Sequence, residues 1–140
     1  KLLLQARRLL GPAMMARGNT ILTEDVCVPI HRLPDLVDGV ADIGHRHGIF
    51  TICPGHAGDG NLHPSVYHEH TPDKHDEFEK LVYDLTGEFG GSISAEHGIG
   101  ISRRPYLKMS RTEEEIETMR TLKRALDPKN IMNPGKIFSL

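Results

Sequence analysis

The chain has 140 residues, of which 38% are apolar and 26% charged, and its net charge is −2. This composition is typical of one soluble globular domain and gives no electrostatic reason to expect a nucleic-acid partner. No apolar run is long enough to form a transmembrane segment. The two cysteines have no close-spaced partner, which favours a reducing compartment.

The first ten residues have a helical pattern that Gly11-Pro12 is expected to end. The chain does not begin with Met, so we expect it to be a piece of a longer polypeptide. Residues 1–23 are interpreted as an N-terminal helical segment and linker, and residues 24–140 as the main domain.

From residue 24 onward, strand and helix patterns alternate. Strands are expected at 26–30, 49–53, 66–67 and 93–95, and helices at 34–47, 71–89 and 112–127, the last with a capping box from Thr112 to Glu115. The order β-α-β-β-α-β predicts an α+β fold of the ferredoxin-like type. In that fold, a split β-α-β antiparallel sheet has both helices on one face, here with an additional C-terminal helix and tail.

The densest chemical signal is the sequence CPGHAGDGNLH, which runs from Cys53 to His63. Asp59-Gly60 favours a two-residue type I′ hairpin turn. That turn would place His56 directly opposite His63, with Cβ atoms about 5 Å apart on one side of the sheet. Two imidazoles at this separation can bind one metal ion. Cys53, at the end of an apolar run, is expected to be buried rather than a nucleophile.

A second glycine-rich segment, GGSISAEHGIG from residue 90 to 100, contains Glu96 and His97. In extended backbone these neighbours point in opposite directions, so one can bind a metal while the other contacts a different partner. His56, His63 and Glu96 would form a two-histidine, one-carboxylate set with open positions for a substrate. Spacing alone leaves a plain hairpin with a cross-strand histidine pair, and a solvated Glu-His loop, equally open.

Taken together, these motifs resemble the C-terminal region of FAD-linked oxidases. That family includes the glycolate oxidase flavoprotein subunit, D-lactate dehydrogenase and D-2-hydroxyglutarate dehydrogenase. The resemblance runs from about Glu24 to the end and includes the closing sequence IMNPGKIF. It implies a substrate-side cap domain whose FAD-binding domain precedes it in the same polypeptide. The isolated fragment is therefore expected to be inactive and to bind no FAD tightly, and Asn133 is expected to contact the flavin in the intact protein.

The resemblance also implies a mechanism. His56, His63 and Glu96 would hold a divalent metal, zinc in several relatives, and His97 would be the base. A small 2-hydroxy acid of the glycolate or D-lactate type would lose its hydroxyl proton to His97 and a hydride to the flavin. The implied partners are this substrate, the FAD-binding domain and, as in some relatives, an iron–sulfur acceptor subunit. The expected location is the cytoplasm, including the periphery of the inner membrane.

Three alternatives remain open at this point. The chain could be a metal-dependent hydrolase, a non-catalytic ferredoxin-like binding module, or a family member that has lost its metal. No cation for the substrate carboxylate is assigned, because Thr23 stands near the place where some relatives have a lysine. Arg103 and Arg104 are interpreted as surface charges.

Overall fold

The computed structural model describes residues 2–16, 20–68 and 73–140, and it mixes helices with antiparallel sheet, as expected for the α+β class. Two three-stranded sheets are present. In the first, β6 (Ser65–His68) lies between β1 (Thr20–Thr23) and β3 (Phe50–Ile52). In the second, β5 (Asn61–Leu62) lies between β2 (Val26–Cys27) and β4 (Gly55–His56).

Three segments of the chain, residues 20–27, 50–56 and 61–68, each pass from one sheet to the other. Two of the breaks contain Pro54 or Pro64, which have no N–H to continue a strand ladder. Single backbone hydrogen bonds cross the breaks, from Glu24 N to Pro64 O at 2.8 Å and from His63 N to Pro54 O at 2.7 Å. The segment that contains β5 and β6 is central, and the predicted hairpin joins it to the segment that contains β3 and β4.

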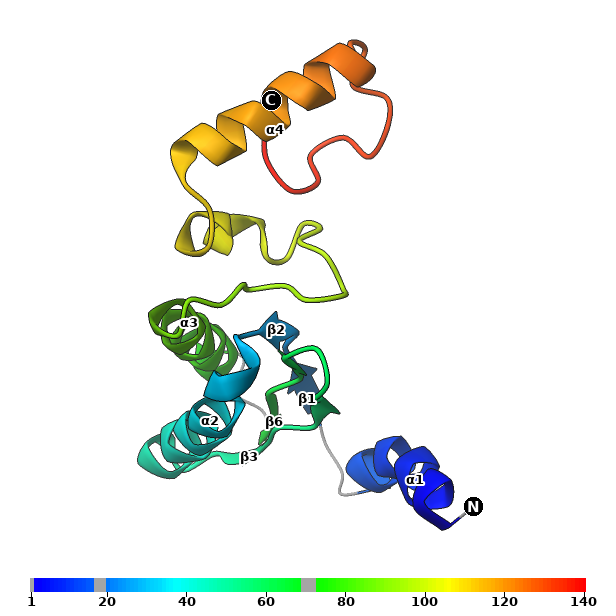
Figure 1. The fold of residues 1–140 in the computed structure, drawn as a ribbon, viewed down its shortest axis with the longest axis vertical. Coiled ribbons are helices and arrows are strands. Elements are labelled where there is room, and N and C mark those ends of the chain that lie inside the picture. The colour runs from blue at the N-terminus through cyan, green and yellow to red at the C-terminus, as the bar shows by residue number, and fades with distance from the viewer. Residues whose placement is uncertain (1, 17–19, 69–72) are drawn as a thin grey trace.

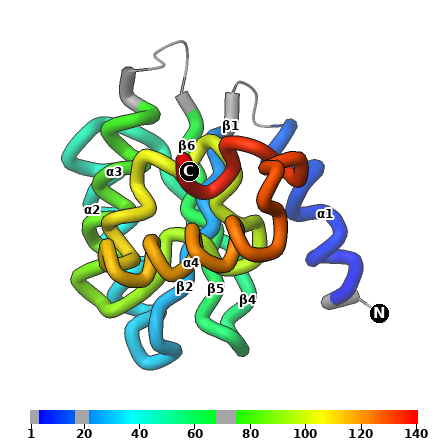
Figure 2. The backbone as a smooth tube through the Cα atoms, turned by 90° about the horizontal axis from the view of Figure 1, so that it is seen from above, coloured from blue at the N-terminus to red at the C-terminus, as the bar shows by residue number. Residues whose placement is uncertain are grey.

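Two helices, α2 (Leu33–His47) and α3 (Asp73–Glu88), pack against each other on one side of the strands, as predicted (Figures 1 and 2). A short 3-10 turn, η1 (Ile30–Arg32), leads into α2, and Gly48 ends it in the left-handed conformation with φ of 63°. The core lies between these helices and the strands. It consists of Val26, Val28, Leu36, Val40, Ile43, Leu62, Val66, Phe78, Val82, Tyr83 and Ile93.

The regular fourth strand expected at 93–95 is not formed. A single bridge between Cys27 and Ser92 stands in its place, and Ile93 is buried beside it. The chain then bends, because the residues after Ile93 donate hydrogen bonds to one carboxylate, that of Asp25, instead of to a neighbouring strand.

The first helix, α1 (Leu2–Ala16), continues through Gly11-Pro12, so the predicted end of the helix is wrong. Proline disfavours a helical residue before it because its ring clashes with that residue's Cβ. Gly11 has no Cβ, so this part of the clash is absent in α1. Figures 1 and 2 show α1 on the side of the strands away from α2 and α3.

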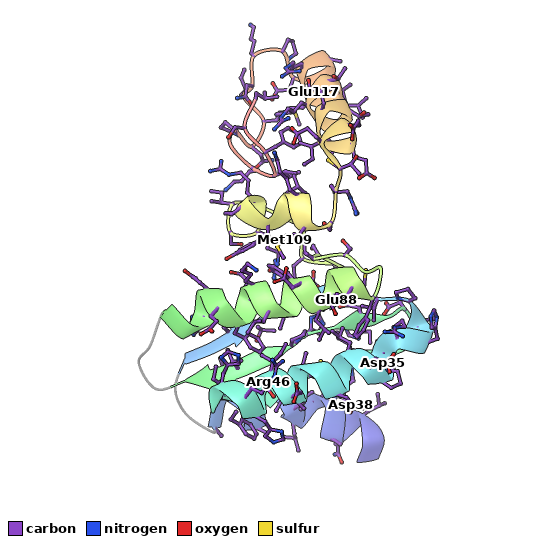
Figure 3. All side chains as sticks on the ribbon, turned by 90° about the vertical axis from the view of Figure 1, so that its left-hand side faces the viewer. Asp35, Asp38, Arg46, Glu88, Met109 and Glu117 are labelled. Atoms are coloured by element: carbon purple, nitrogen blue, oxygen red, sulfur yellow. The ribbon has the colours of Figure 1, made fainter. Side chains whose placement is uncertain are left out.

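The last helix, α4 (Glu113–Leu126), follows the 3-10 turn η2 (Arg104–Met109), and both lie beyond α3 (Figure 3). The predicted capping box is confirmed: Glu115 N donates to the Thr112 hydroxyl, and Thr112 N donates to the Glu115 carboxylate. Of the apolar side chains of α4, Ile116 is buried whereas Leu126 is 82% exposed. Among the described residues, no helix is both long and apolar enough to cross a bilayer.

Replacing Gly60 by Ala is expected to destabilise the domain by about 1–3 kcal/mol from backbone strain alone. Gly60 has φ of 79°, and an added Cβ would lie 2.2 Å from the carbonyl oxygen of Val28. Gly58 provides the matched control, because a Cβ there meets nothing within 4 Å. Urea unfolding of both variants checks this, and equal stabilities of the two would contradict it.

Candidate functional site

The hairpin between β4 and β5 has a different register from the predicted one. His56 pairs with Asn61, so the loop has four residues, 57–60, instead of two. A type I′ turn needs positive φ at both central residues, and only Gly60 of the pair has it. Asp59 instead accepts a hydrogen bond from Asn61 N at 3.3 Å. Because side chains alternate along a strand, a shift of two residues leaves His56 and His63 on the same side.

Four of the predicted site residues come together at this side. The rings of His56 and His63 are 5.4 Å apart and nearly perpendicular, at 88°. Oε1 of Glu96 lies 3.4 Å from Nε2 of His56 and 3.3 Å from Nε2 of His63. His97 stacks on His63 with ring centres 5.3 Å apart, and its Nε2 lies 3.9 Å from the same Glu96 oxygen.

Asp25 explains how Glu96 and His97 reach the hairpin. This residue is fully buried, and its Oδ2 accepts hydrogen bonds from Ser94 Oγ and from three successive backbone N–H groups, those of residues 95–97, at 2.8–3.0 Å. Burial raises the pKa of Asp25, but the hydrogen bonds, first that from His97 N–H, outweigh burial and hold the pKa below its usual value. Sequence reasoning missed this residue, although two neighbouring acids, Glu24 and Asp25, directly before the predicted strand were a signal.

A buried network supports the other end of the same loop. Arg103 donates to Gly98 O at 3.2 Å, to the Tyr83 hydroxyl at 3.1 Å and to Glu24 at 3.3 Å. The Tyr83 hydroxyl also donates to Glu24. Burial, together with the hydrogen bond and charge of Glu24, raises the pKa of Tyr83, so the phenol keeps its proton. Arg103 is only 9% exposed, so its interpretation as a surface charge is wrong.

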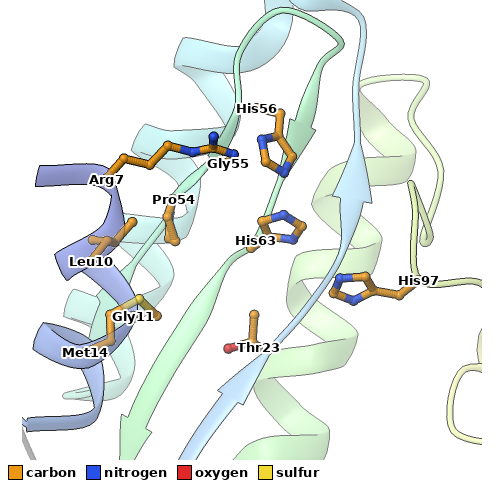
Figure 4. A pocket seen from close by; sticks show the side chains of 10 residues that line it. All are labelled: Arg7, Leu10, Gly11, Met14, Thr23, Pro54, Gly55, His56, His63 and His97. Carbon is orange, nitrogen blue, oxygen red and sulfur yellow. The ribbon is translucent and has the colours of Figure 1, made fainter. Parts of the chain in front are cut away.

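A cavity of about 450 Å³ opens beside the histidines (Figure 4). Its lining combines residues of α1 with residues of the strands: Arg7, Leu10, Gly11, Met14, Thr23, Pro54, Gly55, His56, His63 and His97. In Figure 4 the side chain of Arg7 extends from α1 toward Gly55 and His56. No sequence pattern places Arg7 here, because about fifty residues separate it from the hairpin.

The residues present fit a divalent metal ion. Two ligand atoms that bind one ion at about 2.0–2.1 Å in tetrahedral geometry lie about 3.3–3.4 Å from each other. The Glu96 oxygen lies at this distance from Nε2 of His56 and from Nε2 of His63. The group of residues whose ligand atoms all lie within 4.8 Å of one another is Asp25, His63, Glu96 and His97, and it does not include His56. Asp25 suits binding less well, because four donors already occupy its Oδ2.

Two further residues singled out in the sequence, Cys53 and Asn133, lie outside the histidine cluster. Burial raises the pKa of Cys53 to about 12, so its thiol is protonated at neutral pH and is not a nucleophile. Asn133 has φ of 48° and belongs to the tail that runs beside α4, away from the hairpin (Figure 1). Its contact with a flavin stays a prediction.

Comparison with known proteins identifies the family of the chain. The family described as "FAD linked oxidases, C-terminal domain" matches residues 1–137. The chain belongs to this family. The match includes α1, which supplies Arg7 to the cavity.

Several curated relatives of the FAD-linked oxidase domain are similar over most of the chain. It is 39% identical to the glycolate oxidase subunit GlcD of Bacillus subtilis, with 98% of this chain and 30% of that protein covered. It is 41% identical to D-2-hydroxyglutarate dehydrogenase of Stutzerimonas stutzeri (82% and 26%) and 40% identical to D-lactate dehydrogenase of Archaeoglobus fulgidus (86% and 27%). The chain therefore spans less than a third of the length of these relatives.

Proposed function

We propose that the chain is the substrate-side cap domain of a flavin-dependent enzyme that oxidises a small 2-hydroxy acid to the 2-oxo acid with the help of a divalent metal. The observation that carries this proposal is the position of Glu96, whose Oε1 lies within 3.4 Å of Nε2 in both His56 and His63. Two imidazoles and one carboxylate suit zinc or a similar ion and leave coordination positions for a substrate.

The substrate class follows from what three relatives have in common. Their names refer to glycolate, D-2-hydroxyglutarate and D-lactate, each of which has a hydroxyl group on the carbon next to a carboxylate. A cavity of about 450 Å³ has the usual size of a small-molecule site, about 300–1,000 Å³. We infer that the substrate of this protein is also a 2-hydroxy acid.

Arg7 is the residue that we assign to the substrate carboxylate. It lines the cavity together with the three histidines and has a positive charge. Thr23, on the opposite wall, is uncharged and cannot bind the carboxylate as a cation. A guanidinium binds a carboxylate through two parallel hydrogen bonds, which also fixes the orientation of the acid. This orientation would direct the hydroxyl group toward the histidines.

His97 is the residue that we assign to proton removal. It lies at the cavity wall and its side chain is 47% exposed, so a substrate can reach the imidazole. Its backbone N–H donates to Asp25, which fixes the position of the backbone. A neutral imidazole can accept a proton near neutral pH. The proton of the substrate hydroxyl would go to Nε2 of His97.

The bound groups supply the remainder of the oxidation. A divalent ion held by His56, His63 and Glu96 would act as a Lewis acid on the hydroxyl oxygen. The bound FAD would supply the acceptor for the hydride of the hydroxyl-bearing carbon, while His97 takes the hydroxyl proton. The acid thus loses two hydrogens and two electrons and becomes the 2-oxo acid. The residues of this chain bind and orient the acid and remove its proton.

We assign FAD binding mainly to a preceding domain of the same polypeptide, because the relatives are more than three times as long as this chain. An iron–sulfur subunit is our candidate electron acceptor. We also interpret the strands as a ferredoxin-like sheet with a reduced fourth strand. Residues 61–68 lie between residues 20–27 and 50–56, and Ser92 forms a bridge with Cys27 at the position of the fourth strand.

Anaerobic mixing of the intact protein with each candidate acid tests the proposal. Glycolate, D-lactate or D-2-hydroxyglutarate is expected to bleach the flavin absorbance, and a chelator is expected to abolish the bleaching until zinc is restored. Failure of all three acids to reduce the flavin would contradict the proposed substrate class. Bleaching that chelation leaves unchanged would contradict the role of the metal.

Replacing Arg7 by Met is expected to raise KM for the 2-hydroxy acid by roughly 10–100-fold, since hydrogen bonds to charged groups contribute about 1.5–3 kcal/mol. Arg8 is exposed, adjacent in α1 and not part of the cavity lining, so Arg8→Met is the matched control. Steady-state kinetics of both variants check this, and an unchanged KM in Arg7→Met would exclude Arg7 from substrate binding.

A further inference from the structure

One carboxylate contacts both halves of the candidate metal centre. Asp25 lies at the break between β1 and β2 and is fully buried. Its Oδ2 accepts the hydrogen bonds from residues 94–97, while its Oδ1 faces Nδ1 of His63 at 3.7 Å. The loop that carries Glu96 and the strand segment that carries His63 therefore meet at this side chain.

The two facing atoms, Oδ1 of Asp25 and Nδ1 of His63, are both buried and have no hydrogen-bond partner among the described residues. An unpaired buried donor or acceptor costs about 1–3 kcal/mol. At 3.7 Å the pair is too far apart for a hydrogen bond, but a shift of roughly 0.7 Å would close it. One proton on Nδ1 would then satisfy both atoms.

We propose that Asp25 is a positioning residue that fixes the proton of His63 on Nδ1 and thereby leaves Nε2 free to bind the metal ion. The inference rests on the proposed function, because it assigns His63 as a ligand. Nε2 of His63 is the atom that lies 3.3 Å from Glu96 Oε1. Metal-binding histidines commonly donate their other ring N–H to a carboxylate, which sets the tautomer and the ring orientation.

The other oxygen of Asp25 positions the remaining ligand. Three successive amides, those of Ala95, Glu96 and His97, point at Oδ2, so the backbone direction at Glu96 is set by the carboxylate that orients His63. Asp25 itself lies on the Nδ1 side of the His63 ring, opposite the Nε2 side where Glu96 and His56 gather. Its carboxylate is close enough to be a ligand as well, and we assign it to positioning His63 and Glu96 because Oδ2 is already filled by four donors and Oδ1 faces Nδ1 of His63.

The substitution Asp25→Asn tests this role. The amide oxygen can still accept hydrogen bonds from residues 95–97, but the amide N–H would face Nδ1 of His63 as a donor. The proton of His63 is then expected to move to Nε2. Two-bond ¹H–¹⁵N spectra of the zinc-free intact protein with ¹⁵N-labelled histidine report the tautomer directly, at a pH where the ring carries one proton. His63→Gln assigns the signal.

The expected result is an Nδ1–H tautomer of His63 in the wild type and an Nε2–H tautomer in Asp25→Asn, with about 10–100-fold weaker zinc binding in the variant. Ser94→Ala is the control, because it removes one donor to Oδ2 and leaves Oδ1 untouched. It should keep the wild-type tautomer and nearly the wild-type zinc affinity.

An identical tautomer in wild type and Asp25→Asn would overturn the inference, as would an equal change in Ser94→Ala. The tautomer is read without metal or substrate, so it decides the role of Asp25 even if the protein oxidises no 2-hydroxy acid. Conversely, a wild-type protein that binds no zinc would refute the metal in the proposed function, whatever the tautomer.

Discussion

Replacing His97 by Asn is expected to lower kcat for 2-hydroxy-acid oxidation by about 10²–10⁴-fold, the usual contribution of a positioned general base. The main-chain N–H that donates to Asp25 is retained in the variant, so the loop conformation should survive. The side chain loses the Nε2 atom that faces the cavity, and with it the proton acceptor. Zinc content and KM should change little. Stopped-flow reduction of the flavin measures the affected step.

The zinc content of His97→Asn distinguishes a base from a metal ligand. His97 belongs to the group of four residues whose ligand atoms lie within 4.8 Å, so a ligand role is the competing interpretation. Loss of zinc in the variant would support that interpretation and contradict the assignment as base. His45→Asn, an exposed histidine in α2, controls for the change of residue type and should leave kcat unchanged.

Replacing Arg103 by Met is expected to destabilise the domain by about 3–5 kcal/mol, because it leaves the Glu24 carboxylate buried without its cation. Glu24 is 2% exposed, and its remaining hydrogen bond from Tyr83 does not supply a compensating charge. The variant also loses the hydrogen bond to Gly98 O and thus one attachment of the Glu96–His97 loop. Urea unfolding, with coincident transitions by two probes, measures the change.

Two comparisons identify the cause of that destabilisation. Arg104 is exposed, so Arg104→Met should change the free energy of unfolding by no more than about 0.5 kcal/mol. Adding Glu24→Gln to Arg103→Met removes the unpaired charge, so the double variant should be more stable than the sum of the single changes indicates. Strict additivity would mean that the pair does not interact, contrary to the 3.3 Å contact.

The position of His56 and His63 on one side of the hairpin could be predicted from the sequence, even though the turn and the register were predicted wrongly. A two-residue loop and a four-residue loop differ by two residues in register. Every second side chain of a strand points to the same face of the sheet, so a shift of two residues does not change the face. The prediction that both imidazoles share a side therefore did not depend on the turn type. The choice between the two loops depended on Asp59, whose side chain accepts a hydrogen bond from Asn61 N and whose φ is not positive.

The remainder of the site comes from contacts between residues far apart in the chain. Glu96 reaches the hairpin because Asp25, about seventy residues earlier, binds the backbone of the loop. Arg7 reaches the cavity because α1 continues through Gly11-Pro12 and lies beside the strands. Neither contact has a periodic or local signature, so composition and spacing could name Glu96 as a candidate but could not place it.

The position of a metal ion tests the central claim most directly. Crystals of the intact protein grown with zinc, with anomalous data collected on both sides of the zinc absorption edge, would locate any bound ion. We expect one peak about 2 Å from Nε2 of His56, Nε2 of His63 and a carboxylate oxygen of Glu96. A fully loaded crystal with no peak there, or with zinc bound elsewhere, would contradict the proposed centre.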